Sequence, residues 1–153
     1  MAYGPQDTSS NRSHRPIVLV AEDDPSERLL IEDVLQSGRT FLDVRFVVDG
    51  EELLGVLHRD ALQPDLIMLE VNLLGMNGHD VLKEIKANGR LRTIPVIFFT
   101  DSQRKEDLQT AYDHGASAYI VKPSSPGTFA ATLKMAAGMW LKAKDGNPVS
   151  GPG

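Results

Sequence analysis

Short apolar runs alternate with longer stretches of helical periodicity along most of the chain. The runs are rich in β-branched residues and are mostly uninterrupted by polar ones, which is typical of strands covered on both faces. They lie at residues 17–21, 44–48, 66–69, 95–99 and 118–121. In the intervening stretches apolar residues recur at helical spacing. Helices are therefore predicted at residues 25–37, around 53–57, at 78–87, at 105–114 and from 126 to about 142.

Five strand–helix units in strict alternation predict an α/β fold, a doubly wound (βα)5 parallel sheet with right-handed crossovers. The turn after the first strand reads Glu22-Asp23-Asp24-Pro25, not the glycine-rich turn of a dinucleotide-binding fold. Asp24 suits a helix N-cap, and Glu27 three residues later resembles the second half of a capping box. We therefore expect the flavodoxin-like strand order 2-1-3-4-5, with a crevice beyond the C-terminal strand ends.

The two ends of the chain are polar and carry Gly and Pro without periodicity. We expect a disordered N-terminal arm at 1–15, one domain at 16–142 and a disordered tail at 143–153. Of 153 residues, 41% are hydrophobic and 24% charged, the formal net charge is -5, and cysteine is absent. This composition argues against a nucleic-acid-binding surface, disulfides and thiol chemistry, and no apolar run is long enough to span a membrane. A cytoplasmic protein is expected.

Four of the predicted strands end in residues with charged or hydroxyl side chains. These residues are the acidic pair Glu22-Asp23, then Glu70, Thr100 and Lys122. Three carboxylates this close do not all ionise readily, and a Mg²⁺ ion is a natural compensation. Asn72, two residues beyond Glu70, offers a backbone carbonyl to the same ion. With a hydroxyl and a lysine added, the set predicts a site for phosphoryl transfer to or from an acid.

The order and spacing of these residues resemble the receiver domain of two-component response regulators, over about residues 16–142. Four segments carry the likeness, and they read VLVAEDDPS at 18–26, PDLIMLEVN at 64–72, IPVIFFT at 94–100 and GASAYIVKP at 115–123. The segment at 88–95 and the last helix near Trp140 are similar to single-domain receivers that partner bacterial phytochromes.

The resemblance implies a role for each matching residue. Asp23 would hold Mg²⁺ directly and Glu22 through water, with the Asn72 carbonyl as a further ligand. Thr100 and Tyr119 would form the switch pair that moves on activation. Lys122 would contact the phosphoryl group, and its bond to Pro123 would be cis.

The chain departs from the family's pattern at the centre of the site. Glu70 stands where the family has the phosphoacceptor Asp, Leu74 replaces a common Pro, and Asp101 adds a charge beside the site. The extra methylene of Glu70 misplaces the attacking oxygen, so phosphorylation should be impaired or absent. It also moves the carboxylate toward Thr100 and Lys122. There it would imitate a phosphoryl group in part, with one charge in place of about -1.5 to -2.

These observations predict a stand-alone response regulator that acts by docking to a sensor histidine kinase, a phytochrome or a second copy of itself. The homodimer would form through the last strand–helix unit. One alternative is a phosphorylation-independent adaptor with a fixed Glu70–Lys122 pair. The other is a Mg²⁺-dependent phosphatase or phosphotransferase, which lacks a second nucleophile. The histidines, His14, His58, His79 and His114, share no ligand spacing and are expected at the surface or satisfied.

Overall fold

The computed structural model describes residues 15–38 and 41–144. The arm and the tail predicted at the two ends of the chain lie outside this part, apart from Arg15 and the last two residues of the final helix. Among the described residues, no helix is long and apolar enough to cross a membrane.

Five strands form one parallel sheet, and its order β2-β1-β3-β4-β5 confirms the predicted topology. The strands are β1 (Ile17–Ala21), β2 (Asp43–Val47), β3 (Leu66–Leu69), β4 (Val96–Thr100) and β5 (Ala118–Val121). All four residues of the central strand β3 are buried. Continuous burial follows from helices on both faces, because a strand so covered has no side for polar residues.

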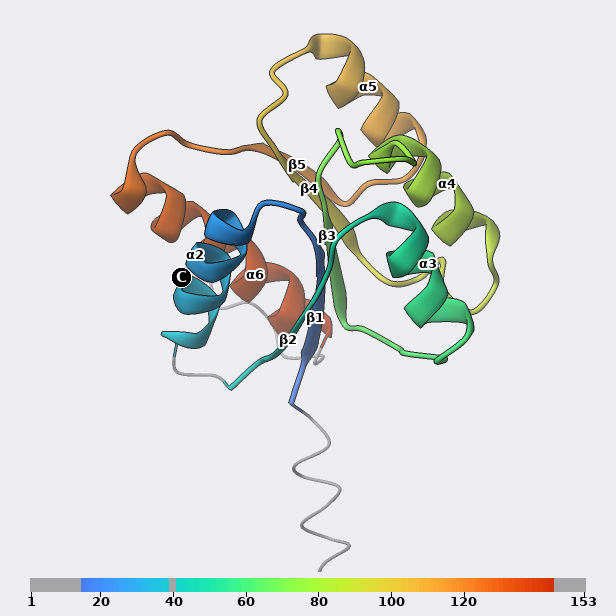
Figure 1. Ribbon diagram of the computed structural model, residues 1–153, viewed down its shortest axis with the longest axis horizontal. Coiled ribbons are helices and arrows are strands. Elements are labelled where there is room, and N and C mark those ends of the chain that lie inside the picture. Colours follow the sequence, from blue (N-terminus) through green and yellow to red (C-terminus); the bar gives the residue numbers. More distant parts are fainter. Residues whose placement is uncertain (1–14, 39–40, 145–153) are drawn as a thin grey trace, which may run out of the picture.

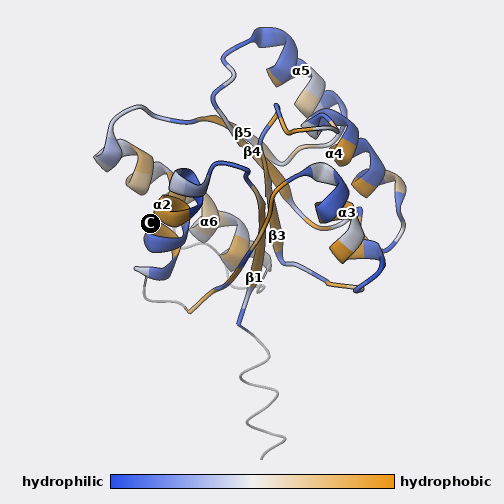
Figure 2. Ribbon diagram, viewed as in Figure 1, coloured by the Kyte–Doolittle hydropathy of each residue, from blue (hydrophilic) through white to orange (hydrophobic). Residues whose placement is uncertain are grey.

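The helices lie in two layers, as Figure 1 shows with the sheet seen nearly edge on. One layer holds α2 (Pro25–Gln36) and α6 (Pro126–Lys144), which pack against each other. The other holds α3 (Gly50–His58), α4 (Gly78–Ala87) and α5 (Lys105–Asp113). Hydropathy follows this arrangement, with the apolar strands enclosed between helices whose outer faces are polar (Figure 2). The doubly wound architecture expected from the alternation of elements is therefore confirmed.

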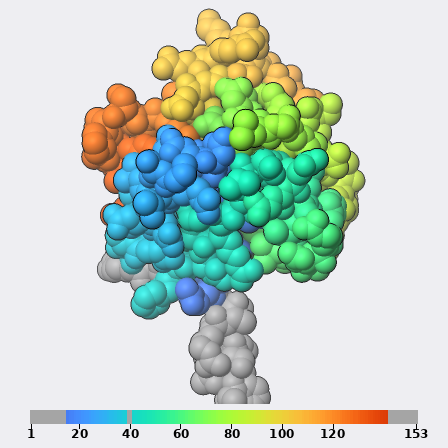
Figure 3. Space-filling model, in the orientation of Figure 1, coloured from blue at the N-terminus to red at the C-terminus, as the bar shows by residue number. Residues whose placement is uncertain are grey.

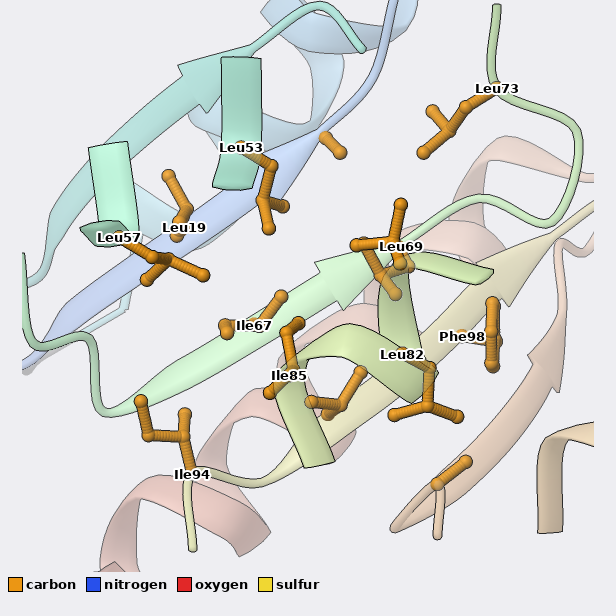
Figure 4. Packing of buried hydrophobic residues seen from close by; sticks show 14 of the residues in the cluster. Leu19, Leu53, Leu57, Ile67, Leu69, Leu73, Leu82, Ile85, Ile94 and Phe98 are labelled. Atoms are coloured by element: carbon orange, nitrogen blue, oxygen red, sulfur yellow. The ribbon is translucent and has the colours of Figure 1, made fainter. Parts of the chain in front are cut away.

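Successive residues of β3 divide between two apolar cores, one on each face of the sheet. Leu66 and Met68 belong to the core beneath α2 and α6. Ile67 and Leu69 point the other way, into the core that also holds Leu82 and Phe98 (Figure 4). The strand is thus packed on both faces, and it places residue 70 at the C-terminal end of the central strand.

Close packing also fixes the loop that follows β3. The Gly78 N–H donates to the carbonyl of Val71 at 2.8 Å. A Cβ at Gly78 would clash with the Glu70 carbonyl oxygen and would lie 3.0 Å from the Phe98 ring. The glycine therefore allows the start of α4 to pack directly against the backbone that carries Glu70.

Two local predictions differ from the structure. The Lys122–Pro123 peptide bond is not cis. The Lys122 side chain reaches its partners from the trans form, which is the more stable by about 0.5–1 kcal/mol for a bond preceding proline. Asp24 does cap α2, accepting from the Ser26 N–H at 2.9 Å, but the Glu27 carboxylate does not complete a capping box. It binds Lys122 instead.

Candidate functional site

The C-terminal strand ends surround an open pocket of about 200 Å³. Five of its lining residues were predicted as site residues and three were not. They are Glu22, Asp23, Glu70, Asn72 and Lys122, together with Asp24, Glu27 and Asp101. Figure 3 shows the loops after β1 (blue), β3 (green) and β4 (yellow) next to one another on this surface. The sheet topology thus brings the predicted cluster together.

The Lys122 side chain, only 4% exposed, lies among three carboxylates. Its Nζ is 3.0 Å from Glu22 Oε1, 2.5 Å from Glu27 Oε1 and 2.8 Å from Glu70 Oε1. Each acid comes from a different element: Glu22 follows β1, Glu27 lies in the first turn of α2, and Glu70 follows β3. The expectation that Glu70 pairs with Lys122 is confirmed, and the pair is part of a larger ion cluster.

Burial and the contacts between these groups shift the pKa values of Lys122 and Glu22. Burial disfavours the Lys122 ammonium, but hydrogen bonds to Glu27 and Glu70 and the charges of Glu70 and Glu22 outweigh it, so the pKa of Lys122 lies above its usual value. Burial raises the pKa of Glu22, and its contact with Lys122 opposes that rise only in part. The opposition is only partial because three carboxylates share the single Lys122 ammonium. The cluster is therefore an acid-rich site with a firmly charged lysine.

The second carboxylate oxygen of Glu70 faces the end of β4. Glu70 Oε2 accepts a short hydrogen bond from the Thr100 hydroxyl, and it lies 3.0 Å from the N–H of Val71. Thr100 is fully buried, so this bond is protected from water. The Thr100 oxygen in turn accepts from the Ser102 N–H at 3.1 Å. Glu70 thus connects Lys122 with the backbone of the loop after β4.

The hydrogen-bond chain continues from that loop to two other elements. The Ser102 hydroxyl donates to Asp107 Oδ2 at 2.5 Å, and the Tyr119 hydroxyl donates to the Ser102 carbonyl at 3.0 Å. Asp107, in the first turn of α5, also binds His79 Nε2 at 3.1 Å. The Ser102 and His79 contacts lower the pKa of Asp107. A connected path therefore runs from the Glu70 carboxylate to α5, β5 and α4.

His79 was expected at the surface or satisfied, and the structure bears this out only in part. The residue is buried against the Phe98 ring, and its Nε2 has the Asp107 partner. Its Nδ1 is buried without a hydrogen-bond partner. A buried N–H without an acceptor is costly, so a tautomer that carries its hydrogen on Nε2, where Asp107 accepts it, suits the contacts.

The predicted Mg²⁺ ligands fit the ion in kind but not wholly in arrangement. Carboxylate and carbonyl oxygens are the donors that Mg²⁺ prefers, and Asp23 and Asn72 line the pocket. The carboxylates of Glu22 and Glu70 are turned toward Lys122 instead. Within residues 15–38 and 41–144, no group of three acidic or histidine side chains is arranged to hold a metal ion. Asp23 and Asn72 are thus the two predicted ligands that line the pocket and are not turned toward Lys122.

Sequence reasoning missed Glu27 as a member of the site. It was interpreted as a capping residue because it lies three positions after the N-cap Asp24. The available signal was its position in the first turn of a helix that starts at the site itself. A side chain there points back toward the helix N-terminus and so toward the strand ends.

The comparisons with known proteins agree with this geometry. The response regulator receiver domain model matches residues 18–134. The chain is 30% identical over 146 residues to a probable methanogenesis regulatory protein, FilR2, of Methanothrix harundinacea, covering 92% of this chain and 94% of that protein. The phosphorylated cyanobacterial phytochrome response regulator RcpA is similar in structure, with a TM-score of 0.80, 29% identity, and coverage of 84% of this chain and 96% of that one. The Mn²⁺-bound form of response regulator Rcp1 gives a TM-score of 0.78 and 26% identity, covering 83% and 95% of the two chains.

Proposed function

Since the chain belongs to the response regulator receiver family, we propose that it is a two-component signalling receiver whose phosphoacceptor position carries a built-in acid in place of a transferable phosphoryl group. Glu70 holds that position. The protein acts by docking to a partner, and its docking surface is set by the contacts of Glu70.

One observation carries this proposal, namely the two-sided engagement of the Glu70 carboxylate. One oxygen meets the Lys122 ammonium at 2.8 Å, and the other accepts from the Thr100 hydroxyl. The resemblance assigns Lys122 to the phosphoryl group and Thr100 to the switch pair, and a hydroxyl can donate to a phosphoryl oxygen as it does to this carboxylate. The Tyr119 hydroxyl is at the same time bound to the Ser102 carbonyl. The imitation is partial, because a carboxylate brings one charge and two oxygens where a phosphoryl group brings about -1.5 to -2 and three.

The proposed partner is a sensor histidine kinase, with a phytochrome as input module. The likeness to RcpA, a phytochrome response regulator, supports the second part. Mg²⁺ would be held by Asp23 and the Asn72 carbonyl, with Glu22 joining them if it turned away from Lys122. The Mn²⁺-bound form of Rcp1 supports binding of a divalent ion. When bound, the ion supplies positive charge beside Glu70. The protein would work in the cytoplasm, without catalytic activity of its own.

Intact mass measurement tests the proposal. The wild-type protein and the variant Glu70→Asp are incubated with acetyl phosphate and Mg²⁺. We expect no phosphorylation of the wild type, because the longer side chain misplaces the attacking oxygen, and measurable phosphorylation of Glu70→Asp. The variant Glu70→Gln is the control, since it lacks a nucleophilic carboxylate. Stoichiometric phosphorylation of the wild type would refute the proposal that Glu70 stands in place of a transferable phosphoryl group.

A second function is favoured by the closed ion cluster around Lys122. In that alternative the chain is a phosphorylation-independent adaptor, and the Glu70–Lys122 pair is a fixed structural element. Partner binding separates the two. A switch responds to both Glu70→Asp and Glu70→Gln, whereas a fixed adaptor binds its partner equally well in all three forms once folding is confirmed.

A homodimer through β5 and α6 is also proposed. Val121, Met135 and Met139 of this unit are exposed, which supports an apolar contact between copies. Light scattering at micromolar concentration tests it. A monomeric mass would exclude a stable dimer in that range.

A further inference from the structure

The hydrogen-bonding capacity of Lys122 is fully used. An ammonium group has three N–H donors and no acceptor. Three carboxylate oxygens surround Nζ, from Glu22, Glu27 and Glu70. Each acid can therefore take one donor, and none is left over for a further oxygen. Any oxyanion that binds Lys122 must first displace one of the three acids.

Glu27 is the acid with the most exposed side chain and the fewest partners. Its side chain is 27% exposed, against 6% for Glu22 and 10% for Glu70. The other two have further partners: Glu22 Oε2 accepts from the Asp24 N–H at 3.1 Å, and Glu70 binds Thr100. Among the described residues, the carboxylate of Glu27 has Lys122 as its hydrogen-bond partner and no other. Displacing Glu27 thus breaks one contact, while displacing either neighbour breaks at least two.

We propose that Glu27 is a gate on Lys122, whose carboxylate must swing away before a phosphoryl oxygen or a similar oxyanion can bind the ammonium. The inference rests on the proposed function, because it assigns the regulation of that same site. In the closed state shown here, Glu27 both occupies a donor and adds a negative charge that repels an incoming oxyanion.

The helix that carries Glu27 also offers the released side chain a place to go. Glu27 is the third residue after the N-cap Asp24, the position from which a capping-box glutamate reaches the N-cap N–H. An acid in the first turn is also favoured by the helix dipole. The Asp24 N–H is now bound by Glu22. The released Glu27 carboxylate therefore stays at the exposed, electropositive start of the helix while Glu22 keeps the Asp24 N–H.

Chemical labelling of lysines in the intact chain tests the gate. The rate at which an amine-reactive reagent modifies Lys122 is measured by mass spectrometry at fixed pH, with exposed Lys83 and Lys105 as internal references. We expect Glu27→Gln to raise the relative rate of Lys122 by about three- to tenfold, since a neutral amide oxygen accepts from the ammonium more weakly than a carboxylate does. Glu32→Gln is the matched control, because Glu32 lies exposed on the same helix. Equal Lys122 rates in the two variants would overturn the proposal.

A second variant separates the effect of the length of the Glu27 side chain from the effect of its charge. Glu27→Asp keeps the negative charge but shortens the side chain by one methylene, so it cannot hold Lys122 as Glu27 does. We expect it to behave like Glu27→Gln. If Glu27→Asp labelled like the wild type, Glu27 would act only through its charge, and the gate would be excluded. Circular dichroism of every variant confirms that each is folded before labelling.

Phosphorylation in the Glu70→Asp background connects the gate to function. We expect Glu27→Gln to accelerate acetyl phosphate labelling of that variant, because Lys122 is then available to the phosphoryl group. If Glu70→Asp is phosphorylated but Glu27→Gln does not accelerate it, the gate is wrong and the proposed function stands. If Lys122 becomes more reactive in Glu27→Gln but Glu70→Asp is never phosphorylated, the gate stands and the proposed function fails.

Discussion

Replacing Lys122 with Met keeps the length of the side chain and removes the cation from the cluster. The change leaves Glu22 and Glu70 with side chains only 6% and 10% exposed, and without the ammonium now 3.0 Å and 2.8 Å from their oxygens. Removing one partner of a buried ion pair typically costs about 3–5 kcal/mol. Both acids keep a backbone N–H partner, so we expect the lower end, about 3 kcal/mol, at pH 7.

Urea unfolding at two pH values measures this effect. The pKa of Lys122 is raised in the folded state, so its stabilising contribution is present below the ordinary lysine pKa and is lost only as the pH rises through the raised value. Near pH 4 the loss in Lys122→Met should shrink, because protonated acids need no cation and burial already raises the pKa of Glu22. Lys105→Met, at an exposed position, is the control. A loss below about 1 kcal/mol at pH 7, the range of surface pairs, would refute the reasoning.

Three further substitutions test the frame around the site by urea unfolding. Gly78→Ala should cost about 1–3 kcal/mol because its Cβ meets backbone, whereas Gly89→Ala, which has open space, should change stability little; equal effects would count against tight packing behind the site. Arg90→Ala should cost about 1–2 kcal/mol, since its guanidinium binds the end of α3 and the loop beyond; an unchanged midpoint would contradict this. Asp107→Asn should cost about 1–2 kcal/mol at pH 7 and less near pH 3. The pKa of Asp107 is lowered in the folded protein, so its charge stabilises the fold above the ordinary Asp pKa, and this contribution is lost as the pH falls through the lowered value. A loss of stability that did not depend on pH would contradict a role for the Asp107 charge.

The fold could be predicted because the pattern of the sequence reports burial directly. The run Leu66–Leu69 is apolar on both faces, and the structure places it at the centre of the sheet between two helical layers. The strand order followed from excluding a glycine-rich turn after β1. Strand and helix limits agree to within two residues except at α3, which begins at Gly50, three residues before the predicted stretch. Its start depends on the local cap by Asp49, which accepts from the Glu52 N–H.

The location of the site could be predicted from the sequence, but several of its side-chain contacts could not. Glu70, Thr100 and Lys122 could be brought together because parallel strands end at the same edge. The third acid on Lys122 could not, since Glu27 obeys a local capping rule equally well. The His79–Asp107 contact also joins two helices far apart in sequence. Such pairings depend on how helices pack in space, which periodicity does not specify.

We propose that Glu70 holds Thr100, Ser102 and Tyr119 as a phosphoryl group would, while Glu27 remains on Lys122. Backbone NMR spectra of the wild type, of Glu70→Asp and of phosphorylated Glu70→Asp test it most directly at Ser102, Asp107 and Tyr119, which the hydrogen-bond chain links to Glu70. We expect the wild-type signals at these positions to lie close to those of phosphorylated Glu70→Asp. Wild-type signals that coincide with those of unphosphorylated Glu70→Asp would contradict it.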